Sequence, residues 1–132
     1  MLKMLFVCRA NLNRSPRAAE VFERLAKELG FAVEVSSAGT DAFWANQSED
    51  VLLRVCGVSR STQLTKEMVA EADIVYALDG YVERDLASYN IPPEKLVCLY
   101  IDDEYSKCRG NLDELYALLE KVLRPVVLEL LN

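Results

Sequence analysis

The chain of 132 residues contains no histidine. This absence removes the side chain that most often transfers protons near neutral pH, so proton transfer must be done by another group, such as a carboxylate. The four cysteines, at positions 8, 56, 98 and 108, form no Cys-x-x-Cys pair. Without histidine and without paired cysteines, we expect no metal site and no metal cofactor.

Long apolar runs and an excess of positive charge are also absent. The apolar segment before Arg9 spans only residues 1–7, which is too short for a secretory signal or a membrane span. The net charge of −6 argues against a nucleic-acid or anionic-membrane partner bound by general electrostatic attraction. We therefore expect a cytoplasmic protein, because a reducing compartment keeps cysteines as free thiols.

The length and the apolar pattern indicate one α/β domain over residues 1–132. Strands are expected at 3–7, 31–36, 73–78 and 95–101. Helices are expected at 16–29, about 47–56, 65–70, 80–89, and from Asn111 onward with a kink at Pro125. The alternation predicts a three-layer, doubly wound sandwich with helices on both faces of a four-stranded parallel sheet of order 2-1-3-4.

The segment from Leu5 to Pro16 carries the strongest chemical signal, because an apolar strand leads directly into Cys8 and an Arg14-Ser15 pair follows. A short loop between a parallel strand and a helix directs backbone N–H groups inward, and the helix N-terminus adds positive potential. An oxyanion fits such a loop. The same field favours the thiolate form of Cys8, which is the nucleophilic form.

A cysteine after an apolar strand is usually a small buried hydrophobic residue. Here the spacing to Arg14, the following Ser15 and Pro16 in the first turn of the predicted helix favour a catalytic role. The guanidinium of Arg14 is suited to hold two phosphate oxygens.

Several acidic residues are expected beside this loop. Asp41, Asp79 and Asp103 all follow the carboxyl ends of predicted strands, where open α/β sheets bind their ligands. Asp79 is a candidate to orient Ser59, Arg60 or the acidic loop at 102–104.

These motifs resemble the low-molecular-weight protein tyrosine phosphatases. The resemblance is carried by Cys8-x5-Arg14-Ser15-Pro16 and continues, in order, through residues 36–40, 61–65, 72–79 and 102–105. It implies a cysteine-dependent phosphatase that hydrolyses phosphotyrosine-type aryl phosphates through a cysteinyl-phosphate, with phosphotyrosine proteins or small aryl phosphates as partners and a monomeric state.

The resemblance also implies the roles of individual residues. Cys8, Arg14 and Asp103 are the expected catalytic residues, with Asp103 preferred to Asp102 as the acid. The expected substrate-binding residues are Arg9, Ala10, Asn11, Leu12, Asn13, Ser15, Trp44 and Tyr105.

The chain departs from the family pattern at three of its positions. Ala10 replaces a frequent glycine, Asn13 replaces a second cysteine, and Glu104 replaces the proline after the acid. By contrast, Leu12 matches tyrosine-directed members, whereas a threonine there would suggest phosphoarginine.

Two alternatives remain open. A thiol-coupled arsenate reductase shares the fold and loop but needs further cysteines, whereas this chain has Ala77-Leu78-Asp79 at the end of the third strand. A non-catalytic phosphate or phosphopeptide binder would retain the loop without efficient turnover.

Overall fold

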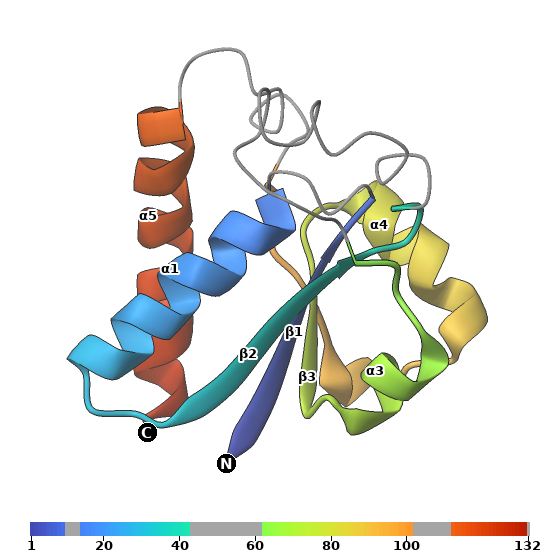
Figure 1. Ribbon diagram of the computed structural model, residues 1–132, viewed down its shortest axis with the longest axis horizontal. Coiled ribbons are helices and arrows are strands. Elements are labelled where there is room, and N and C mark those ends of the chain that lie inside the picture. The colour runs from blue at the N-terminus through green and yellow to red at the C-terminus, as the bar shows by residue number, and fades with distance from the viewer. Residues whose placement is uncertain (10–13, 43–61, 102–111, 132) are drawn as a thin grey trace.

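The computed structural model describes residues 1–9, 14–42, 62–101 and 112–131, which form an α/β fold around one parallel sheet (Figure 1). The sheet has four strands in the order β2-β1-β3-β4. All of its neighbouring strands are parallel, which confirms the predicted topology. The predicted helix at 47–56 lies outside the described residues.

The strands and helices follow one another along the chain much as predicted. The strands are β1 (Leu2–Cys8), β2 (Val33–Gly39), β3 (Ile74–Ala77) and β4 (Leu96–Cys98). The α-helices are α1 (Arg14–Glu28), α3 (Lys66–Glu71), α4 (Gly80–Asp85) and α5 (Leu112–Leu130). Two 3-10 helices, η3 (Leu86–Tyr89) and η4 (Pro93–Lys95), complete the described elements.

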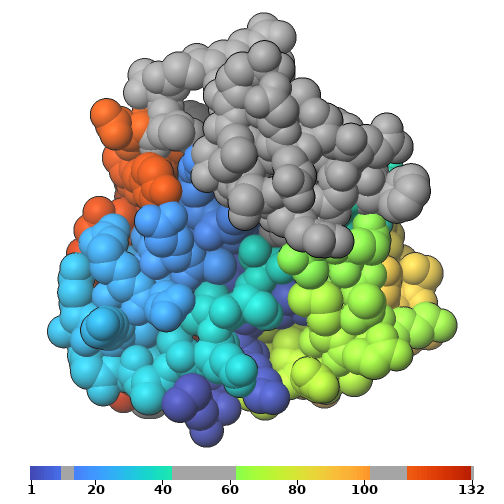
Figure 2. Space-filling model, in the orientation of Figure 1, coloured from blue at the N-terminus to red at the C-terminus, as the bar shows by residue number. Residues whose placement is uncertain are grey.

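Alternate residues of the central strands face two separate hydrophobic cores, because successive side chains of a strand point to opposite faces of the sheet. Met4 and Phe6 lie in one core together with buried residues of α1 and α5. Leu5 and Val7 lie in the other core, with Val69 of α3 and Val82 of α4. Helices therefore cover both faces of the sheet, as the sequence predicts, and Figure 2 shows the edge strand β2 between α1 and the segment of α3.

The first helix begins two residues earlier than predicted, at Arg14 instead of Pro16. Proline is tolerated throughout a first helical turn, where its missing N–H has no intrahelical partner. The helix ends as expected before Gly30, whose positive φ of 72° suits glycine. Arg14 and Ser15 consequently belong to the first turn of α1, directly beside the end of β1.

The second strand begins two residues later than predicted, at Val33 instead of Phe31, and ends three residues later, at Gly39. Residues 37–39 were expected in a loop, but they pair with residues 6–8 of β1 and belong to β2. This pairing brings the end of β2 level with Cys8.

The fourth strand and the helix at 80–89 are less regular than predicted. Tyr100 has a left-handed φ of 55°, which ends regular strand geometry before Ile101. Leu99 and Ile101 nevertheless donate hydrogen bonds to the carbonyls of Ala77 and Leu78, so this segment still lies along the end of β3. The helix changes to 3-10 geometry at Leu86 and ends at Asn90, which has a φ of 54°.

The last helix, α5, packs against α1 in the core that also contains Met4 and Phe6. Leu115, Leu119 and Leu123 are buried, and Leu118 is partly buried against the same core. Pro125 lies inside α5 on its exposed side.

Candidate active site

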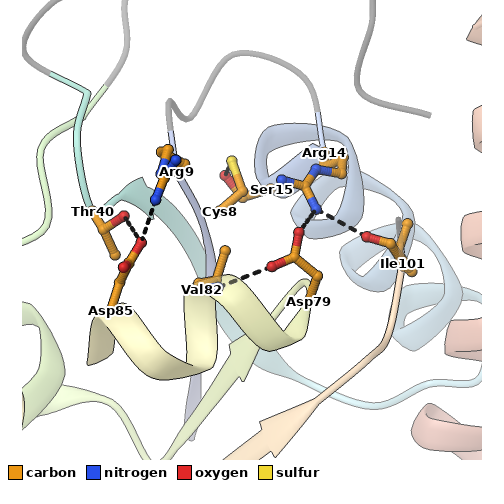
Figure 3. A network of polar contacts seen from close by, with 9 residues as sticks. All are labelled: Cys8, Arg9, Arg14, Ser15, Thr40, Asp79, Val82, Asp85 and Ile101. Atoms are coloured by element: carbon orange, nitrogen blue, oxygen red, sulfur yellow. Dashed lines mark hydrogen bonds and ion pairs between the residues drawn. The ribbon is translucent and has the colours of Figure 1, made fainter. Parts of the chain in front are cut away.

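Cys8 is the last residue of β1, and its thiol points toward the first turn of α1 (Figure 3). The side chain is only 3% exposed. Its sulfur lies 3.0 Å from the hydroxyl oxygen of Ser15, a distance at which the two groups form a hydrogen bond. The structure therefore places a hydrogen-bonded thiol at the carboxyl edge of the sheet.

The backbone around Cys8 is held by the end of β2. The amide of Thr40 donates to the carbonyl of Cys8 at 3.0 Å, and the amide of Asp41 donates to the carbonyl of Arg9 at 2.7 Å. The hydroxyl of Ser15 also lies 3.4 Å from the carbonyl of Ala38. These contacts fix the point at which the chain leaves the sheet to enter the Cys8–Arg14 loop.

Arg14 is buried beside the same edge of the sheet, with its side chain 4% exposed. Its Nη1 donates to Oδ2 of Asp79 at 2.5 Å and to the carbonyl of Ile101 at 2.9 Å. A buried cation of this kind requires both charge compensation and hydrogen bonds. The Asp79 carboxylate compensates the charge of the guanidinium, and the two contacts together hold Nη1 in place.

Asp79 holds Arg14 while also starting a helix. It is the N-cap of α4, and its Oδ1 accepts a hydrogen bond from the amide of Val82 at 2.9 Å. Burial opposes ionisation of this carboxyl, but the Val82 amide and the Arg14 guanidinium together hold the pKa of Asp79 below its usual value. The carboxylate is therefore charged at neutral pH and compensates Arg14.

Arg9 lies at the margin of the site and is 62% exposed. Its Nη2 lies 3.5 Å from Oδ2 of Asp85, the last residue of α4. The hydroxyl of Thr40 lies 3.3 Å from the same carboxylate oxygen. This cluster joins β1, β2 and α4 next to Cys8 (Figure 3).

The structure brings together the predicted residues Cys8, Arg14 and Ser15, with Arg9 beside them. The other predicted site residues lie outside the described residues: Ala10, Asn11, Leu12, Asn13, Trp44, Asp103 and Tyr105. Ser59 and Arg60, which we expected as partners of Asp79, also lie outside.

The contact between Asp79 and Arg14 was not predicted from the sequence. A usable signal was present, because an aspartate that follows a strand and precedes a helix is a good N-cap and lies at the ligand-binding edge of an α/β sheet. The sequence does not show that the arginine 65 positions earlier reaches the same carboxylate.

Residues 1–9, 14–42, 62–101 and 112–131 contain no group of three or more cysteine or acidic side chains arranged to hold a metal ion. None of the helices in these ranges combines the length and the apolar character needed to cross a bilayer.

Comparison with known proteins identifies relatives of this site. Residues 3–130 match the family described as low molecular weight phosphotyrosine protein phosphatase. A low molecular weight protein-tyrosine phosphatase A of Mycobacterium tuberculosis is 29% identical, covering 92% of this chain and 87% of the relative. A putative low molecular weight protein-tyrosine-phosphatase of Synechocystis is 27% identical, with 90% of each chain covered.

Solved structures agree with this match over nearly the whole chain. A mutant of YwlE from Bacillus subtilis superposes with a TM-score of 0.78 at 25% identity, and both chains are fully covered. A second structure, described as the YwlE arginine phosphatase with a phosphorylated active-site serine in place of cysteine, gives a TM-score of 0.76 at 25% identity and covers 99% of this chain and 97% of that one.

Proposed function

The chain belongs to the low molecular weight phosphotyrosine protein phosphatase family, and on this premise we propose that it hydrolyses phosphotyrosine-type aryl phosphate monoesters through a covalent phosphate on Cys8. The observation that carries the proposal is the contact of 3.0 Å between the Cys8 sulfur and the Ser15 hydroxyl, next to the buried Arg14. A thiol, a hydroxyl donor and a fixed guanidinium meet at one sheet edge.

The first step is an in-line attack. The Cys8 thiolate forms a sulfur–phosphorus bond as the bond between phosphorus and the aryl oxygen breaks. Arg14, held by Asp79 and Ile101, stabilises the negative charge on the equatorial oxygens, and the amides of the Cys8–Arg14 loop assist it. Because these groups supply positive charge, the mechanism requires no magnesium.

The leaving aryl oxygen takes a proton from Asp103, the acid that the family resemblance indicates. In the second step, water attacks phosphorus, gives a proton to the Asp103 carboxylate and displaces the Cys8 thiolate. The Ser15 hydroxyl donates to that sulfur and so makes it a better leaving group.

Phosphotyrosine-containing proteins and small aryl phosphates are the proposed substrates, and Leu12, Trp44 and Tyr105 are the proposed contacts of the aromatic ring. The name of the second structural relative describes an arginine phosphatase. This chain has Leu12 at the position where a threonine would suggest phosphoarginine, and this leucine supports the proposal of an aryl substrate. We also propose that the protein works as a monomer in the cytoplasm, where Cys8 stays reduced.

The arsenate-reductase alternative has little support among the described residues. Their free cysteines are Cys8 and Cys98, and β3 separates the two strands that carry them. Neighbouring strands lie about 4.8 Å apart, so the two backbones are roughly 10 Å from one another. This separation exceeds what a disulfide can bridge.

Chemical trapping tests the proposal. The protein is mixed with a phosphotyrosine peptide, quenched in acid within milliseconds and digested for mass spectrometry. The proposal expects a phosphate on the Cys8 peptide in the native protein and a persistent phosphate on the corresponding serine peptide in Cys8→Ser. Turnover without phosphate on either peptide would show that water attacks the substrate directly and would overturn the mechanism.

A further inference from the structure

Two arginines lie on opposite sides of Cys8 in Figure 3. Each contacts a carboxylate at one end of α4: Arg14 contacts Asp79 at the N-cap, and Arg9 contacts Asp85 at the last helical residue. The two arginines are therefore held in a similar way, each by a carboxylate of α4. The exposure of their side chains differs greatly.

Arg14 is 4% exposed, so its charge acts inside the phosphate-binding loop. Arg9 is 62% exposed, so its charge is available at the mouth of the site. Because Arg9 directly follows Cys8 in the chain, the part of a substrate that extends from an anion bound at Cys8 is expected near the exposed guanidinium.

Arg9 is also fixed more firmly than an ordinary surface arginine. Its carbonyl accepts from the amide of Asp41 at 2.7 Å, which holds its backbone. Its side chain meets Asp85, which also accepts a hydrogen bond from the hydroxyl of Thr40. This arrangement lowers the entropy lost when a second anion binds.

We propose that Arg9 is a specificity-determining residue that binds the carboxylate of an acidic residue beside the phosphotyrosine of a peptide substrate. The inference rests on the proposed phosphatase function and names its substrate class: acidic phosphopeptides.

The contact with Asp85 is compatible with this role. An exposed ion pair contributes little stability, so sharing the guanidinium with a second carboxylate costs little. A guanidinium carries five N–H donors on three nitrogens, and the contact with Asp85 uses one of these nitrogens, Nη2.

The charge of the whole chain makes a local cation necessary for such a substrate. At a net charge of −6, the protein as a whole repels an acidic peptide. Arg9 supplies attraction at the place where the peptide enters the site. Short-range recognition of this kind weakens with added salt.

Two phosphotyrosine peptides test the proposal. They are identical except that the residues on both sides of phosphotyrosine are glutamate in one and glutamine in the other. The native protein is expected to show a kcat/KM about 1.5-fold to fivefold higher for the glutamate peptide, the range of an exposed ion pair. This ratio should fall toward one as sodium chloride is added.

Variants assign the preference to a residue. In Arg9→Gln the ratio of the two kcat/KM values is expected to fall to about one, whereas Arg9→Lys should keep part of it. Arg24→Gln is the matched control, because Arg24 is also exposed and paired with carboxylates but lies further along α1. It should leave the ratio unchanged.

Equal rates on the two peptides in the native protein, or an unchanged ratio in Arg9→Gln, would overturn the inference while the phosphatase function stands. Failure to hydrolyse either peptide would overturn the proposed function and the inference together.

Discussion

Nη1 of Arg14 and Oδ2 of Asp79 lie 2.5 Å apart in a buried ion pair that joins the first turn of α1 to the N-cap of α4. The same nitrogen also donates to the carbonyl of Ile101. The orientation of Arg14, the proposed phosphate-binding residue, therefore depends on the segments that follow β3 and β4.

Asp79→Asn tests this dependence. The neutral amide leaves the Arg14 cation uncompensated, so kcat/KM for an aryl phosphate is expected to fall roughly tenfold to hundredfold through misplacement of the guanidinium. The free energy of unfolding should fall by about 3 kcal/mol, as for a broken buried pair. Steady-state kinetics and urea denaturation measure the two effects.

Asp113→Asn is the control, since Asp113 is exposed in the first turn of α5. A variant Asp79→Asn with native kinetics would show that the ion pair does not prepare Arg14.

The lowered pKa of Asp79 predicts how the free energy of unfolding depends on pH. The pKa of folded Asp79 lies below the ordinary value of 3.8. Ionised Asp79 therefore stabilises the fold at every pH above that ordinary value, and the stabilisation is lost as the pH falls through the lowered pKa. The difference in unfolding free energy between the native protein and Asp79→Asn should be constant from pH 7 to about pH 5 and shrink at lower pH. A difference that grows as the pH falls would contradict this assignment.

Ser15→Ala tests the hydroxyl beside the Cys8 sulfur. Hydrogen bonds to charged groups contribute about 1.5–3 kcal/mol, so loss of this donor is expected to slow breakdown of the cysteinyl-phosphate by about tenfold or more. In stopped-flow measurements, this change would appear as a rapid burst of the phenol product followed by a slow steady-state rate.

The exposed Ser36 of β2 supplies the matched control, because Ser36→Ala removes the same hydroxyl away from the site. If Ser15→Ala turns over at the native rate, the hydroxyl does not stabilise the departing thiolate.

Asp103→Ala tests the acid that the family resemblance indicates. Its turnover of phenyl phosphate should fall by about 10²–10⁴, the usual contribution of general acid catalysis. An ester with a very good leaving group needs no proton, so its turnover should fall much less. Asp102→Ala is the matched control, and selective loss of phenyl phosphate turnover in that variant would move the acid to Asp102.

Much of the fold could be predicted from the sequence because apolar spacing and cap residues are local signals. Thr65 caps α3 at the start of the helix predicted over 65–70, with its hydroxyl accepting from the Met68 amide. The sheet order also agrees with the prediction. One error falls where partners distant in sequence decide the structure, because residues 37–39 became strand by pairing with residues 6–8. The early end of β4 has a local origin instead: Tyr100 has a left-handed φ, which a tyrosine in the sequence does not signal.

In the candidate site, too, the arrangement of residues close in sequence could be predicted, and contacts between distant residues could not. Cys8, Arg14 and Ser15 form one short motif, and their proximity follows from a strand that leads into a helix. The supporting contacts of Asp79 and Asp85 could not be predicted, since they join residues 65 and 76 positions apart in the chain.

Catalysis by Cys8 is tested most directly by the release of phosphate from para-nitrophenyl phosphate in the presence of EDTA, measured for the native protein and for Cys8→Ser. We predict turnover by the reduced native protein without metal and none by Cys8→Ser. Equal turnover by the two proteins, or none by the native protein with its thiol shown to be reduced, would contradict catalysis by Cys8.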